Sequence, residues 1–192
     1  MYYTLGYSSA MHPCRLLDTG SINKRGLWWD DGEPFAHPPT EPVIAALTPF
    51  EANHPCMSPR LPPFYTVKAP LFREDFIAAL IAAGASNMHL YPAEITDPDN
   101  GEIYTHYKAV NIIGLVNAAD MKRSIATIHD GIAQIDVNFD HLEIAPDRTE
   151  NLLMFRLAEN NGPIIIHETV RDHLVAHGFN DINFYHTSEV AI

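Results

Sequence analysis

Two histidines four residues apart are the first pattern in this 192-residue sequence that could do chemistry. His173 and His177 would lie on the same side of a helix, which is a usual geometry for a pair of metal ligands. They also border an apolar stripe, where histidines commonly pack at the margin of a core. The preceding His167-Glu168 does not complete an HExxH zinc motif, because His173 falls two positions late. We favour the packing interpretation and keep metal binding as the alternative.

An acidic stretch imitates the start of a calcium-binding loop. Asp136, Asn138 and Asp140 occupy the first three ligand positions of such a loop. The sixth position, normally glycine, is His141, and the twelfth is Asp147 instead of a bidentate glutamate. The polar residues also alternate with apolar ones, which is typical of a half-buried β-strand. We therefore expect a strand here and no calcium site.

Motifs for catalysis are absent from the sequence. It contains neither of the glycine-rich phosphate loops (GxxxxGK[ST] and GxGxxG) nor the GxSxG turn of hydrolases. Cys14 and Cys56 lie among prolines, without the helix-start signal that activates a nucleophilic thiol. The sequence thus predicts no catalytic residue, no metal and no cofactor.

Two acidic segments are better suited to binding another protein. In the first, a Trp-Trp pair precedes an acidic turn, and an exposed tryptophan beside carboxylates is a good anchor for a cationic partner. The second segment, residues 136–150, carries five acidic residues and one arginine. The candidate partner-binding residues are Trp28, Asp30, Asp31, Glu33, Asp136, Asp140 and Glu143. The alternative is that one tryptophan packs inward and both segments are solvated surface.

An internal repeat predicts the elements that position these residues. Residues 72–91 and 166–185 match with an offset of 94. Each copy has an acidic residue at the expected helix start, an apolar stripe at helical spacing, a glycine to end the helix, and an alternating strand. We expect two similar helix-strand units sharing one sheet. Coincidence is the alternative, because this pattern is common in α/β proteins.

The rest of the chain is expected to supply strands and an irregular arm. Eleven prolines between residues 11 and 70 predict an irregular wrap. Strands are expected at residues 1–8, 27–29, 64–67, 103–104 (in a hairpin with the strand before the 97–102 turn), 107–116, 152–157 and 163–166. The predicted fold is α+β: one domain over residues 1–192, with a Pro-rich irregular N-terminal wrap (1–70) and a core (71–192) in which the two units pack on a mixed sheet.

Charge and composition limit the class of partner. Twelve basic and 24 acidic residues give a formal net charge of −12, which disfavours nucleic acid as a ligand. Such a surface attracts a basic protein and speeds its docking, although acidity can also serve solubility alone. The sequence shows no signal peptide, no apolar stretch of membrane-spanning length and no metal spacing of its two cysteines. These features predict a cytoplasmic protein that binds no membrane.

The order of these motifs resembles one bacterial family, the polymorphic-toxin immunity proteins numbered family eleven, formerly a domain of unknown function. The resemblance covers most of residues 70–186. The first motif is the helix, glycine and strand ending in YPA at residues 72–93, and the second is NIIGLV at 111–116, followed by Asp120 and Ser124. The others are LMFRL at 153–157 and a last unit with Glu168, Gly178 and Phe184. It implies a cytoplasmic immunity protein, an antitoxin without catalytic residues, that occupies a cognate secreted toxin. Residues 34–63 depart from the family pattern and are a candidate contact region.

Three functions follow as hypotheses. The leading one is neutralisation of a cognate toxin, with a basic protein as the candidate partner, by tight stoichiometric binding. The second is a small metal-assisted enzyme with His and Asp ligands, which requires three or more ligands to converge. The third is a self-associating scaffold, which requires a large apolar two-fold interface.

The histidine content predicts how charge-driven binding depends on pH. Protonation of all eleven histidines would change the formal net charge from −12 to −1. The affinity for a basic partner should therefore fall between about pH 7.5 and about pH 5.5, measured as a binding constant at constant ionic strength. Equal affinities at the two pH values would contradict charge-driven binding.

Overall fold

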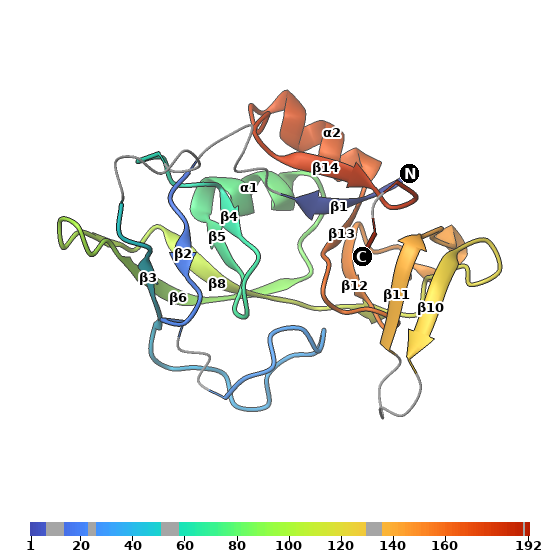
Figure 1. Ribbon diagram of the computed structural model, residues 1–192, viewed down its shortest axis with the longest axis horizontal. Coiled ribbons are helices and arrows are strands. Elements are labelled where there is room, and N and C mark those ends of the chain that lie inside the picture. Colours follow the sequence, from blue (N-terminus) through green and yellow to red (C-terminus); the bar gives the residue numbers. More distant parts are fainter. Residues whose placement is uncertain (7–13, 23–25, 51–57, 130–135, 190) are drawn as a thin grey trace.

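Strands dominate the computed structural model, which describes residues 1–6, 14–22, 26–50, 58–129, 136–189 and 191–192 (Figure 1). The larger sheet has seven strands: β2 (Leu17–Asp18), β3 (Val43–Leu47), β4 (Phe64–Tyr65), β5 (Leu71–Arg73), β6 (Met88–Thr96), β7 (Ile103–Tyr104) and β8 (Tyr107–Ile112). Their order is β2-β3-β6-β8-β5-β4, with β7 paired to β6. This sheet contains both parallel and antiparallel pairs, so a mixed α+β architecture is confirmed.

A second sheet and a separate hairpin complete the strands. The second sheet contains β1 (Tyr2–Gly6), β9 (Leu115–Val116), β12 (Met154–Leu157), β13 (Ile165–His167) and β14 (Asn183–His186), in the order β14-β1-β13-β12-β9. The hairpin consists of β10 (Ile125–His129) and β11 (Asp136–His141). The helices are α1 (Glu74–Ala82), α2 (Glu168–Ala176) and a short 3-10 turn, η1 (Pro146–Arg148). In the described part of the chain, no helix has the length and apolar character needed to cross a bilayer.

The sequence repeat corresponds to two units of one topology. In the first unit, β5 and β6 both pair antiparallel with β8, which lies between them, and α1 connects them. In the second unit, β13 and β14 pair in the same way with β1, and α2 connects them. The orders β6-β8-β5-β4 and β14-β1-β13-β12 are thus equivalent. The central strand follows the first unit along the chain, whereas the second unit takes it from the beginning of the chain.

The helices begin and end at the positions that the repeat predicts. Each starts with an acidic residue, Glu74 or Glu168, which interacts favourably with the positive end of the helix dipole. Each is followed by a glycine with positive φ, Gly84 at 92° or Gly178 at 88°, as a left-handed C-terminal cap requires. The expectation of one shared sheet was wrong, however, because each unit lies in a sheet of its own.

An apolar core joins the two units between their sheets. Phe76 and Leu80 of α1 belong to the same buried cluster as Val170 and Leu174 of α2. Figure 1 shows both helices on the same side of the molecule, and they are in contact with each other. Burying a stripe of this kind contributes about 25 cal/mol per Å² of apolar surface, so the helices are stabilised mainly by this packing.

The chain passes from the larger sheet to the second sheet at Gly114. Its φ of 134° lies outside the range that other residues readily adopt, and it separates β8 from β9. Asn87 fixes this crossing, because its Nδ2 donates to the carbonyl oxygens of Ile113 (2.6 Å) and Met154 (2.8 Å). The strand expected at residues 107–116 is therefore two strands in two sheets.

Residues 1–70 contribute more strands to the sheets than their prolines suggest. β3 pairs parallel with β6, and β2 pairs with β3, although neither strand was expected. The strand expected at 27–29 is absent, whereas those near residues 2–6 and 64–65 are present. The hairpin of β6 and β7 and the antiparallel pair of β12 and β13 are confirmed.

Glu159 is a buried carboxyl beside the apolar cluster that contains Ala119 and Val137, and its side chain is only partly hydrogen-bonded. It is 3 % exposed. Its Oε1 accepts from the backbone N–H of Ala119 at 3.2 Å, while Oε2 has no partner in the described part of the chain. Burial is the main cause that raises the pKa of this carboxyl above its ordinary value. The ionised form of Glu159 therefore costs the folded state free energy at neutral pH.

Glu159→Gln should stabilise the protein at neutral pH. Glutamine keeps the acceptor for Ala119 and removes the buried charge, so we expect a gain of about 1 kcal/mol in unfolding free energy near pH 7.5. The folded wild type binds a proton at Glu159 more readily than the unfolded chain does. The difference in unfolding free energy between the variant and the wild type should therefore shrink as the pH falls toward about 4.5. Urea unfolding of both proteins at a series of pH values measures this difference. A difference that is independent of pH would show that the charge is not its cause.

Candidate functional site

Two adjacent tryptophans, Trp28 and Trp29, face opposite environments. Trp29 is 1 % exposed and makes edge-to-face contacts with Phe35 (4.9 Å between ring centroids) and Tyr91 (5.7 Å). Trp28 is 69 % exposed, the most exposed large apolar side chain in the described residues. The buried ring therefore anchors the segment, and the exposed ring is available to a partner.

The segment from Trp28 to Glu33, called here the Trp28 loop, is held at three points by hydrogen bonds to its backbone carbonyls. The Gly114 N–H donates to the carbonyl of Gly32 at 2.8 Å. Asn111 Nδ2 donates to the carbonyl of Glu33 at 2.7 Å. Asn161 Nδ2 donates to the carbonyl of Asp30 at 3.3 Å. A loop fixed in this way loses little conformational entropy when it binds, which favours affinity.

The carboxylates of the Trp28 loop lie close enough to influence one another. Asp31 is half-buried and Glu33 is exposed. Partial burial raises the pKa of Asp31, and the charges of Asp30 and Glu33 add to the effect. This cluster thus creates a negative potential beside the exposed ring of Trp28, and a cationic group would relieve the repulsion.

The second acidic segment agrees only in part with the sequence prediction. In β11, Val137 and Phe139 are buried and Asp140 is exposed, which confirms the alternating strand. The backbone of Asp136 pairs with His129, but its side chain lies outside the described residues.

Glu143 is already engaged within the chain. Its carboxylate contacts His141 Nε2 at 3.1 Å and Arg123 Nη2 at 3.8 Å. It is also half-buried, so it is a weaker candidate for partner binding than the sequence suggested. A carboxylate that has internal cationic partners gains less from an external one.

One turn brings the two acidic segments together, which the sequence did not predict. Asn160 Nδ2 donates to the carbonyl of Val137 in β11 at 3.0 Å, and Glu159 O accepts from the Val137 N–H at 3.1 Å. The next residue, Asn161, bonds Asp30 of the Trp28 loop. The turn after β12 therefore connects both segments, and we define the candidate surface as Trp28, Asp31, Glu33 and Asp140.

At the end of α2, His173 is half-buried and His177 is exposed, so only His173 lies at the margin of the core. The rings of His173 and His177 stack with centroids 3.9 Å apart, and His177 Nδ1 lies 2.8 Å from the carbonyl oxygen of His173. Across the described ranges of the chain, no three His, Cys, Asp or Glu side chains come together in a way that could hold a metal ion.

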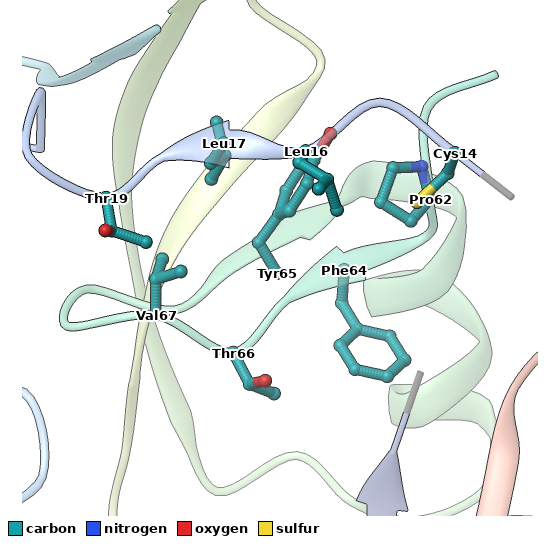
Figure 2. Close-up of a pocket in the computed structure, with 9 residues that line it drawn as sticks. All are labelled: Cys14, Leu16, Leu17, Thr19, Pro62, Phe64, Tyr65, Thr66 and Val67. Atoms are coloured by element: carbon teal, nitrogen blue, oxygen red, sulfur yellow. The ribbon is translucent and has the colours of Figure 1, made fainter. Parts of the chain in front are cut away.

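An apolar hollow of about 320 Å³ lies between β2 and β4 (Figure 2). In Figure 2, Phe64 and Thr66 point to one side of their segment, and Tyr65 and Val67 to the other. No charged side chain lines the hollow. A cavity of this composition can hold an apolar group.

The close approach of the Trp28 loop to β9 can be tested at Gly32. Gly32 has a φ of 69°, and a Cβ there would lie 2.6 Å from Leu115 Cβ and 2.7 Å from Leu115 N. We expect Gly32→Ala to lower the unfolding free energy by about 3 kcal/mol, through the backbone clash and the positive φ together.

Gly101→Ala is a matched control, because Gly101 has a φ of 75° and open space around it. It should cost only about 1 kcal/mol, the cost of the left-handed conformation alone. Urea unfolding measures both variants. Equal losses of unfolding free energy in Gly32→Ala and Gly101→Ala would contradict a tight contact between the loop and β9.

Comparison with known proteins adds no relative. No protein-family model matches this chain, and no curated protein matches its sequence. The resemblance to the immunity family thus stays a prediction from the motifs in the sequence.

Proposed function

We propose that this protein is an immunity protein that binds and neutralises a cognate secreted toxin, using the candidate surface around Trp28. The support comes from the motif resemblance, from the net charge of −12, and from a rigid loop that displays a tryptophan beside carboxylates. Binding of this kind requires shape and charge, and no reaction.

The exposure of Trp28 is the observation that carries the proposal. A tryptophan can bury about 150–250 Å² in an interface, and tryptophans are enriched among the residues that dominate binding energy. Trp28 is 69 % exposed, although three hydrogen bonds hold its loop in place. The free protein leaves this apolar area in water, and a partner that covers the ring would recover its burial energy.

Charge determines which partners suit this surface. Asp31 and Glu33 follow the tryptophan in the same loop, and Asp140 is exposed on β11. A basic partner would be steered to them and would place cations against the carboxylates and the indole ring. A toxin whose active site binds nucleic acid has such a surface, and carboxylates could occupy the positions of its phosphates.

The test is co-expression of this chain with the product of the neighbouring gene. We expect rescue from toxicity together with co-purification of the two proteins.

Trp28→Ala should weaken the purified complex by about 2 kcal/mol or more, roughly 30-fold in Kd, measured by calorimetry. The Asp31→Asn/Glu33→Gln double variant should reduce the association rate and its dependence on salt.

Ile103→Ala is the matched control for Trp28→Ala. Ile103 lies on β7, is 55 % exposed and does not belong to the candidate surface. Its truncation should leave the affinity unchanged. If Trp28→Ala binds the partner as tightly as Ile103→Ala does, the candidate surface is not part of the interface. Failure of both rescue and co-purification would refute the immunity function.

A further inference from the structure

Arg156 is a buried cation that forms no ion pair with the residues the structure describes. It lies on β12 and is 4 % exposed. Its Nη1 donates to the carbonyl oxygens of Asn161 (2.6 Å) and Gly162 (2.9 Å). Within the described part of the chain, Nε and Nη2 have no hydrogen-bond partner and the guanidinium has no salt bridge.

Burial of the charged Arg156 guanidinium destabilises the folded state. It lowers the pKa of the Arg156 guanidinium, while the charge of Asp30 acts in the opposite direction without forming an ion pair. A buried charge normally has a partner of opposite charge or a full set of hydrogen bonds, and Arg156 finds neither among the described residues. The free edge formed by Nε and Nη2 is one of the two edges with which arginine binds a carboxylate through two parallel hydrogen bonds.

A small polar pocket gives access to this site. The pocket has a volume of about 190 Å³, and Arg156, Lys68, Asp30 and Thr66 are among the residues that line it. Lys68 is exposed at the edge of this pocket. The pocket shares Thr66 and Val67 with the apolar hollow of Figure 2, so this segment lies between the two cavities.

We propose that this pocket binds a carboxylate, held by the free edge of Arg156 and by the ammonium group of Lys68. Two cations and the carboxylate of Asp30 give the pocket one net positive charge, which a monoanion neutralises. A phosphate dianion would exceed that charge and would meet Asp30 with greater repulsion. The volume admits the carboxyl group of a small acid, of an acidic side chain or of a chain terminus. This assignment does not depend on the immunity function.

Titration with acetate tests the pocket directly. Acetate is added to the ¹⁵N-labelled protein at fixed ionic strength, with chloride as the exchanged ion, and the arginine Nε–H signals are followed by NMR. The Arg156 signal, assigned from its loss in Arg156→Lys, should shift saturably with a Kd of about 1 to 10 mM. Where that variant does not fold, the Lys68 and Asp30 variants still test the site.

Charge variants around the pocket provide the controls. Lys68→Met should weaken acetate binding roughly three- to tenfold, and Asp30→Asn should strengthen it by a similar factor. Lys122→Met removes the same charge from an exposed residue that does not line the pocket, so it should leave the Kd unchanged.

Three results would overturn the proposal: an Arg156 signal that does not saturate with acetate, equal effects of Lys68→Met and Lys122→Met, or phosphate binding more tightly than acetate.

The source of the carboxylate is tested with the co-purified partner. If the partner supplies it, acetate competes with the partner and Lys68→Met weakens their complex. If a free small acid supplies it, the complex is insensitive to both. Failure of the immunity function would leave the acetate result unchanged.

Discussion

The backbone of Gly114 makes the hydrogen bonds on which both proposed sites depend. Its N–H donates to Gly32 in the Trp28 loop, and its carbonyl accepts from the N–H of Arg156 in β12 at 2.9 Å. Gly114 lies between β8 of the larger sheet and β9 of the second sheet. The loop that displays the tryptophan and the strand that buries the arginine are consequently both hydrogen-bonded to one residue. The apolar core between α1 and α2 makes this junction rigid, because it holds the two sheets together.

Opposite charges lie next to each other around this junction. The Trp28 loop presents Asp31 and Glu33 outward, while Asp30 lines the pocket that contains Arg156. An acidic surface that includes a cationic pocket accepts a narrower range of partners than a uniformly acidic surface does. A partner that is basic over its surface and brings one carboxylate to the pocket would match both parts, whereas a uniformly basic protein would match only the first. The two proposals remain separate, since the pocket can also take a free acid.

The sequence predicted local features well and long-range pairing poorly. The repeat revealed both helices and their strands, because apolar stripes and glycine caps are local signals at 72–91 and 166–185. It could not show that β1 forms the centre of the second unit, since that pairing joins opposite ends of the chain. β3 was missed because its VIAAL sequence is rich in alanine and lies among prolines. At the candidate site, the acidic turn was found, but its contact with Asn161 depends on tertiary structure. The one signal for the buried cation was Arg156 within the apolar run LMFRL.

Hydrogen exchange of the chain, alone and in complex with the product of the neighbouring gene, tests most directly whether binding uses the surface at this junction. Protection should increase at residues 26–35 and 158–163, where the loop and the turn meet. The hairpin of β6 and β7 should exchange at the same rate in both states, because it lies outside the candidate surface. Unchanged exchange at residues 26–35 in a stable complex, with new protection elsewhere, would contradict the account.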